Sequence, residues 1–185
     1  VSPGATPRWF VTIMGGSAVQ EVDLTKLKAG QDPTAGVPMR GEFSPHGLWF
    51  CDDGDHFLTA NTLANTVSLY SANNKMQQSF TGTGGKSPLA TSVFSGYGPG
   101  GCARAYSNNA GTASLSVYDI NPTVGTVARN TNVVPPELRD ADGNLKLRDT
   151  SITPVRWVHM PIQTPVSPDD ATGHGRYMVT ANKAS

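Results

Sequence analysis

Residues 46–71 read HGLWFCDDGDHFLTANTLANTVSLYS. An apolar run is followed by an acidic turn with glycine, by a second apolar run that ends in Thr-Ala-Asn, and by a run in which apolar and polar residues alternate. Such alternation is typical of a half-buried β-strand, and Asp-Gly between apolar runs is a strong hairpin signal. This stretch therefore predicts antiparallel strands joined by tight turns.

The alternating segment returns along the chain at a spacing of 48 residues, which relates two rows of residues: Val19, Val67 and Leu115, and Val22, Tyr70 and Tyr118. The segment before it also repeats, with small shifts, at 8–14, 56–62, 103–109 and 176–182. Each unit then holds about four short strands, which is how a propeller blade is built. In the best-defined unit we expect strands over 45–51, 56–61, 66–72 and 76–81.

The same region resembles the YVTN family of β-propeller repeats, whose pattern is roughly P-H-G, F-S-P-D-G, Y-V-T-N and N-T-V-S-V with short variable spacers. The matching residues are Pro45 to Gly47, Phe50, Asp53-Gly54, Thr59, Asn61 and Asn65 to Ser68. Cys51 and Asp52 replace the usual Ser and Pro. The closing segment PVSPDDATGHGRYMVTAN restores Ser-Pro-Asp and then carries additional residues before its own TAN.

The expected fold is therefore all-β, a partial β-propeller with three to four blades of four antiparallel strands. The blade segments are 9–43, 44–82, 87–128 and 157–185, all within one domain, and 129–156 breaks the period as an inserted loop or hairpin. Propellers close with about four to eight blades. We therefore expect the chain to be a piece of a larger propeller.

Composition restricts the partners. Basic and acidic residues number 14 each, so the formal net charge is zero, and charged residues make up only 15% of the chain. This balance offers no electrostatic footprint for nucleic acid. The sequence also has no apolar run long enough to span a membrane. We expect a protein partner or the remainder of the propeller, in a periplasmic or extracellular setting.

The histidines raise a metal hypothesis, because the repeat is also similar to the propellers of nitrous oxide reductase and of a haem-binding nitrite reductase domain. That resemblance implies copper or haem on the propeller axis. His46 and His159 each precede an expected innermost strand and form the candidate metal pair, whereas His56 and His174 are expected towards the opposite face. Typical catalytic sites use three or four ligands. A structural histidine and a chain without cofactor therefore remain the alternative reading.

The two cysteines, Cys51 and Cys102, are expected near the same face of neighbouring blades. They form either a disulfide or two separate buried thiols. Two acidic turns, 52–55 and 140–144, lack the ligand spacing of a calcium loop and are interpreted as turns. The tryptophans fall on strand patterns and are expected to pack between blades: Trp9, Trp49 and Trp157.

Two functions remain open. The first is a non-catalytic YVTN-type propeller of the cell envelope that acts as a binding or assembly platform. The alternative is a fragment of a periplasmic redox enzyme, a copper- or haem-dependent oxidoreductase with its site on the axis. The sequence has no G-x-S-x-G, phosphate-loop or H-E-x-x-H motif. Whether the chain is an enzyme therefore stays open.

Overall fold

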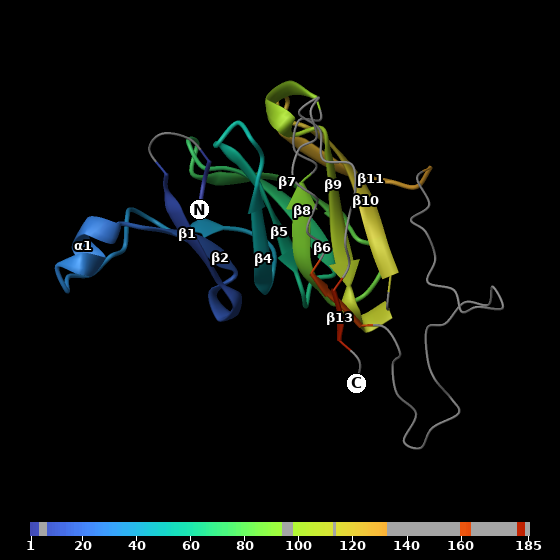
Figure 1. Cartoon of the computed structure of the whole chain (residues 1–185), viewed down its shortest axis with the longest axis horizontal. Coiled ribbons are helices and arrows are strands. Elements are labelled where there is room, and N and C mark those ends of the chain that lie inside the picture. Colours follow the sequence, from blue (N-terminus) through green and yellow to red (C-terminus); the bar gives the residue numbers. More distant parts are fainter. Residues whose placement is uncertain (4–6, 94–97, 113, 133–159, 164–180, 184–185) are drawn as a thin grey trace, which may run out of the picture.

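The computed structural model describes residues 1–3, 7–93, 98–112, 114–132, 160–163 and 181–183. Their strands form four antiparallel sheets (Figure 1). The first has the order β1 (Trp9–Ile13), β2 (Ala18–Val22), β3 (Met39–Arg40), and the second β4 (Pro45–Phe50), β5 (His56–Asn61), β6 (Thr66–Ser71), β7 (Met76–Gly82). The third holds β8 (Pro88–Val93), β9 (Arg104–Asn109), β10 (Ser114–Asn121) and β11 (Thr126–Asn130), and the fourth β12 (Met160–Gln163) and β13 (Ala181–Lys183).

The sheets pack against one another in chain order, through contacts of β1 with β4, of β4 with β8 and of β8 with β12. In Figure 1 the first three sheets stand side by side across the molecule. The fold is a partial β-propeller, as the sequence predicts. In the second sheet the observed strands agree with the expected ones to within one residue at every end.

The register explains why TAN returns near residue 182. Three sheets pair a proline at the start of one strand with an asparagine at the end of the next: Pro45 with Asn61, Pro88 with Asn109, and Pro161 with Asn182. A register shift follows each of these prolines. The pair β12–β13 therefore reproduces the first two strands of a blade, and TAN marks the end of the second.

The asparagine of TAN joins two strands through its side chain. The Asn61 amide nitrogen donates to Thr66 Oγ1 (3.0 Å) and to Ser68 Oγ (2.8 Å), while Thr59 Oγ1 donates to Asn61 Oδ1 (2.9 Å). All of these bonds connect β5 to itself or to β6. We call this set the asparagine hub of the second sheet.

The third sheet repeats the hub 48 residues later. Asn109 donates to Ser114 Oγ (3.2 Å) and to Ser116 Oγ (2.8 Å), and Ser107 Oγ lies 3.4 Å from Asn109 Oδ1. Both asparagines are fully buried. Since a buried amide without partners is costly, this polar position is tolerated only because its hydrogen bonds are made within the blade.

Apolar residues fill the space between neighbouring sheets. Between the first and second sheets lie Val19, Met39, Phe50, Phe57, Tyr70 and Ala72, with Phe10 packed against them. Between the second and third lie Cys51, Leu58, Val67, Leu69, Val93, Cys102, Ala105, Tyr118, Ile120 and Val127. Gly47 lies where β4 meets β8, and a Cβ there would come within 2.6 Å of the Leu89 carbonyl oxygen and of Ala90 Cα. The absence of a side chain thus permits this close approach of two inner strands.

Two sequence expectations are corrected. The first sheet carries a short helix, α1 (Leu24–Lys28), because the Asp23 side chain accepts from the backbone N–H groups of Thr25 and Lys26 as an N-cap. Trp9 and Trp49 do not pack between the described blades, since each is 43% exposed. Most of the expected insertion 129–156, the turn 140–144, Trp157 and residues 176–180 lie outside the described residues.

Candidate functional site

His46 is the second residue of the inner strand β4 and is exposed. Its Nδ1 lies 2.7 Å from the Leu89 carbonyl oxygen on β8, and its own carbonyl oxygen accepts from Thr12 Oγ1 at 2.9 Å. Because a carbonyl oxygen only accepts, Nδ1–H donates, and Nε2 carries the lone pair of the neutral ring. The ring is thereby oriented by the third sheet, while the backbone of His46 is bound by the first.

The described residues do not complete a metal site around His46. The strand register places Leu89 and Ile162 at the positions that correspond to His46, one residue after Pro88 and Pro161, and neither side chain ligates a metal. His159 lies outside the described residues and stands two positions before Pro161 in the sequence. Within the described part of the chain, no three His, Cys, Asp or Glu side chains are grouped to hold a metal. The pairing of His46 with His159 therefore stays a prediction.

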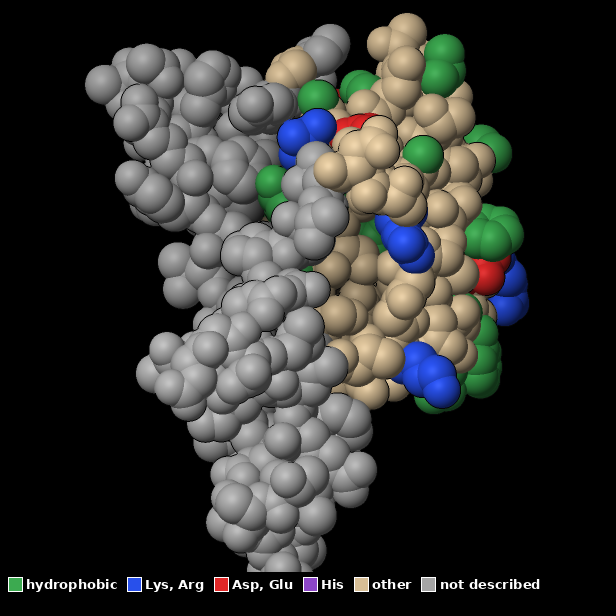
Figure 2. All heavy atoms as spheres, turned by 90° about the vertical axis from the view of Figure 1, so that its right-hand side faces the viewer, with side chains coloured by type: hydrophobic (Ala, Val, Ile, Leu, Met, Phe, Trp, Pro, Cys, Tyr) green, Lys and Arg blue, Asp and Glu red, His purple; other side chains and the backbone are tan. Residues whose placement is uncertain are grey.

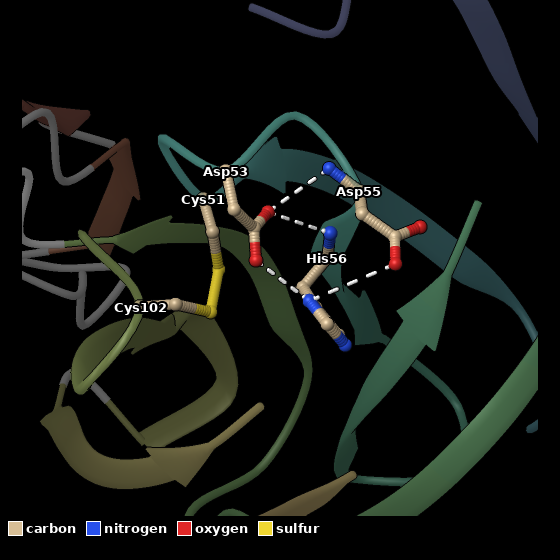
Figure 3. The surroundings of a disulfide bond; sticks show 5 residues. All are labelled: Cys51, Asp53, Asp55, His56 and Cys102. Carbon is tan, nitrogen blue, oxygen red and sulfur yellow. Dashed lines mark hydrogen bonds and ion pairs between the residues drawn. A yellow bond between two sulfur atoms is a disulfide. The ribbon is translucent and has the colours of Figure 1, made fainter. Parts of the chain in front are cut away.

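At the opposite end of the blade, an acidic turn joins β4 to β5 (Figure 3). Asp53 Oδ1 accepts from the backbone N–H groups of Asp55 (2.9 Å) and His56 (2.8 Å), while its Oδ2 accepts from His56 Nδ1 at 2.7 Å. Gly54 has a φ of 71°, the left-handed conformation that favours glycine. Residues 52–55 thus form a turn, as expected, and His56 lies on the side expected for it.

The Asp53–His56 pair fixes the imidazole in the same tautomer as an orienting carboxylate does in catalytic dyads. Asp55 Oδ2 also lies 4.0 Å from His56 Nδ1 (Figure 3), while the Asp55 carboxylate accepts from Ser71 Oγ (3.0 Å) and from the Asn73 backbone N–H (2.7 Å). These bonds hold the turn against the β6–β7 turn. The arrangement is local and serves first to shape two turns.

Cys51 and Cys102 are joined by a disulfide beside this turn (Figure 3). Their Cα atoms are 5.0 Å apart, and both residues are fully buried. Cys51 follows β4, and Cys102 follows η2 (Pro99–Gly101), so the bridge links the second sheet to the third. The Asp53 N–H also donates to the Gly100 carbonyl at 2.9 Å, which ties the same two loops.

A charged link joins the first sheet to the second. Arg8 binds both carboxylate oxygens of Glu21, at 2.7 and 2.9 Å, and also donates to the Ala72 carbonyl and to Asn73 Oδ1. This hydrogen bonding raises the pKa of Arg8 and lowers the pKa of Glu21. Sequence reasoning missed this link and the asparagine hubs. The repeated T-x-N followed by T/S-x-S at fixed spacing was the available signal for the hubs.

The face in Figure 2 carries mainly uncharged side chains, and the Lys and Arg side chains on it lie apart from one another. The described residues on this face form no continuous basic patch. No described helix is long or apolar enough to cross a bilayer. On this side of the molecule the charged side chains are therefore scattered singly among uncharged ones.

Comparison with known proteins supports the fold but does not assign the chain to a family. No protein-family model and no curated protein sequence matches the chain. Among solved structures, a functionally unknown protein from Desulfotomaculum acetoxidans matches 100% of this chain and 57% of its own, with a TM-score of 0.58 and 16% identity. The dihydro-haem d1 dehydrogenase NirN matches 91% of this chain and 32% of its own, with a TM-score of 0.54 and 16% identity.

A third match is the periplasmic gluconolactonase PpgL of Pseudomonas aeruginosa. It covers 100% of this chain and 53% of its own, with a TM-score of 0.51 and 16% identity. These neighbours are β-propeller-type proteins, and the chain spans little more than half of their length or less. At this identity the likeness concerns the fold alone.

Proposed function

We propose that this chain is part of a non-catalytic β-propeller of the cell envelope that acts as a binding or assembly platform. The observation that supports it most is the use of the repeated polar residues. In both four-stranded sheets, the hub asparagine, Asn61 or Asn109, and its hydroxyl partners bind one another within the blade. Polar residues that bind one another in this way hold the strands in position. The result is a rigid scaffold, whose exposed turns are the parts that can bind a partner.

An envelope location is supported by two observations. A disulfide between buried cysteines is typical of proteins in oxidising compartments, and one structural neighbour is named as periplasmic. The expected partner is another protein or the remainder of the propeller, because a chain without net charge has no general attraction for polyanions. We propose no cofactor for this platform.

Metal analysis of protein purified from its native source tests the proposal. We expect copper and iron well below one ion per chain, no haem absorption, and no turnover of gluconolactone, the compound for which one neighbour is named. Stoichiometric copper or haem iron, or lactone hydrolysis, would contradict the platform.

If the chain acts as a binding platform, we expect the partner to bind at one of the two ends of the blades. Leu63, on the turn between β5 and β6, is 62% exposed, and Val124, on the turn between β10 and β11, is 66% exposed at the opposite end. A photo-crosslinking residue at each position in the native envelope should give one discrete protein adduct from one end only. Identical weak smears from both would argue against a specific partner.

The alternative is a fragment of a periplasmic redox enzyme, favoured by the His46 ring alone. A histidine whose Nδ1–H is bound by a backbone carbonyl is oriented as metal-ligating histidines usually are. If metal were found, His46→Gln should lose it and the matched His56→Gln variant should retain it. If both variants retained the metal, the metal would be bound away from both histidines.

A further inference from the structure

Strand β1 has one buried face and one open face. Phe10 packs against Phe50 and Phe57 of the second sheet, with ring centroids 5.4 and 5.5 Å apart. The alternate residues Trp9, Val11 and Ile13 are 43%, 48% and 37% exposed. Since successive side chains of a strand point to opposite faces, these three residues form one apolar surface, which we call the β1 surface.

The register identifies what corresponds to this surface in the other sheets. Val11 pairs with Gln20, as Thr59 pairs with Ser68 and Ser107 with Ser116. By the same register, Trp9 corresponds to Phe57 and Ala105, and Ile13 to Asn61 and Asn109. All six counterparts are fully buried.

In the second and third sheets, this face is covered by the preceding blade. Phe57 and Tyr70 of the second sheet share a core with Val19 and Met39 of the first. Tyr118 and Ala105 of the third share a core with Leu58, Val67 and Leu69 of the second. The position of the β1 surface in the repeat is therefore one at which a blade packs.

The chemistry of the β1 surface is more apolar than that of its counterparts. Val11 and Ile13 stand where the other two sheets carry the hydroxyl and the asparagine of the hub. Exposure of contiguous apolar side chains is typical of an interaction site. A partner at this surface must present apolar side chains, because Val11 and Ile13 offer it no hydrogen bonds.

The edge of β1 is open as well among the described residues, and by the register its neighbour would be an inner strand of its own sheet, distinct from the blade that would cover the β1 surface. Within the described residues, β1 is the outermost strand of its sheet, whereas β5 and β9 each pair with a proline-initiated inner strand. The backbone groups along that edge are thus ready to pair. The solved neighbours are also nearly twice as long as this chain, since it covers 57% and 53% of two of them.

We propose that the β1 surface is the docking surface for a further blade of the same propeller. That blade presents aliphatic side chains equivalent to Leu58, Val67 and Leu69 of the second sheet. The inference rests on the strand register and does not depend on the proposed function.

Hydroxyl-radical footprinting tests the proposal, with Trp9 as probe and Trp49 as reference, because both are 43% exposed. The protein from its native source is compared with the recombinant 185-residue chain at low concentration. We expect Trp9 oxidation to be several-fold slower in the native protein, with Trp49 unchanged. Equal Trp9 oxidation in both samples would overturn the proposal, as would protection that appears in the recombinant chain on concentration, which would indicate a second copy.

A pair of variants separates docking from folding. Val11→Lys charges the β1 surface, and Val37→Lys places the same charge at a residue that is 81% exposed. In the recombinant chain, both variants should melt like the parent. In the native protein, only Val11→Lys should restore fast Trp9 oxidation and lower the melting temperature. If Val11→Lys and Val37→Lys behaved alike in the native protein, the β1 surface would not be a docking surface.

Discussion

The second and third sheets have the same strand register, but the tyrosine at the equivalent position packs differently in each. Tyr70 stacks on Phe57, with ring centroids 5.0 Å apart and planes at 3°. Among the described residues its buried hydroxyl has no partner at hydrogen-bond distance, although the Thr59 hydroxyl is near enough to offset part of the rise that burial causes in its pKa. Tyr118 faces Ala105 across the strands, and its hydroxyl lies 2.7 Å from Ser107 Oγ. One sheet uses an aromatic pair, and the other uses a hydroxyl pair.

The difference shows that the repeat specifies strand geometry more tightly than it specifies the interior. A small residue at position 105 removes the ring on which the tyrosine would stack. Ser107 Oγ then lies at hydrogen-bond distance from Tyr118, whereas the equivalent hydroxyl of Thr59 donates to Asn61. An aromatic pair contributes about 0.5–1.5 kcal/mol beyond the area that it buries, and a typical hydrogen bond contributes a similar amount. The two solutions are therefore comparable in energy and can replace each other.

The largest expected effect is on the bridge that joins the two sheets. Its cysteines are 51 residues apart, and closing a loop of that length stabilises the folded chain by about 4 kcal/mol. We expect the Cys51→Ala, Cys102→Ala double variant to lose about this much free energy of unfolding in urea. Reductant should destabilise the parent and leave the double variant unchanged. Two freely alkylated thiols in unreduced native protein would contradict the bridge.

Removal of a hub should come next. Asn61→Ala leaves Thr59, Thr66 and Ser68 without a buried partner, which should cost about 3 kcal/mol. Asn109→Ala should cost about 2 kcal/mol, because its hydrogen bonds are longer. The exposed Asn74→Ala is the control, with an expected change within about 0.5 kcal/mol. Equal losses in all three variants, measured by urea unfolding, would show that the hubs do not stabilise the blades.

Alkaline pH should destabilise both sheets. Burial raises the pKa of Tyr70 and of Tyr118 to about 12, above the ordinary value of 10.0. The folded state then holds the phenolic protons more tightly than the unfolded state, so this stability is complete below pH 10 and is lost as the pH rises towards 12. Unfolding free energies measured between these values should fall by about 2 kcal/mol per tyrosine. A Tyr70→Phe, Tyr118→Phe double variant that kept the whole decrease would assign it to other groups.

The smallest effect separates the two tyrosines at neutral pH. Tyr118→Phe removes the partner of Ser107 and should cost about 1 kcal/mol. Tyr70→Phe keeps the stacked ring and removes a hydroxyl that has no partner among the described residues, so it should be neutral or slightly stabilising. Thermal unfolding of the two single variants measures the contrast. A greater loss from Tyr70→Phe would mean that its hydroxyl is bonded in solution.

The sequence predicted the strands of the second sheet closely, because alternation and Asp-Gly turns are local signals. It also placed Cys51 at the end of a first strand and Cys102 at the start of the next blade's second strand, towards one face, since the repeat register relates the two blades. It failed for Trp9 and Trp49, because exposure depends on which blades surround a strand. The helix α1 was missed although Asp23 is a good N-cap, since five helical residues give too short a pattern.

The candidate site was less predictable. The expected strand 45–51 already contained His46, and the structure adds its bond to Leu89. That bond connects residues 43 positions apart and leaves no local pattern. Ser44 and Ser87, which precede two inner strands, adopt positive φ values of 62° and 51°. Only the folded chain shows such a conformation in residues other than glycine.

The prolines that open the inner strands also bear on aggregation. Pro45 and Pro88 each start a strand at the edge of a sheet, Pro161 is the second residue of such a strand, and none of them has a backbone N–H. Together with the register shift that follows, they disrupt the flat row of donors on which a foreign strand would grow into a fibril. Strand β1 has the sequence WFVTI and contains neither a proline nor a register shift. Among the described edges on the side of the inner strands, β1 is therefore the one that needs cover during synthesis.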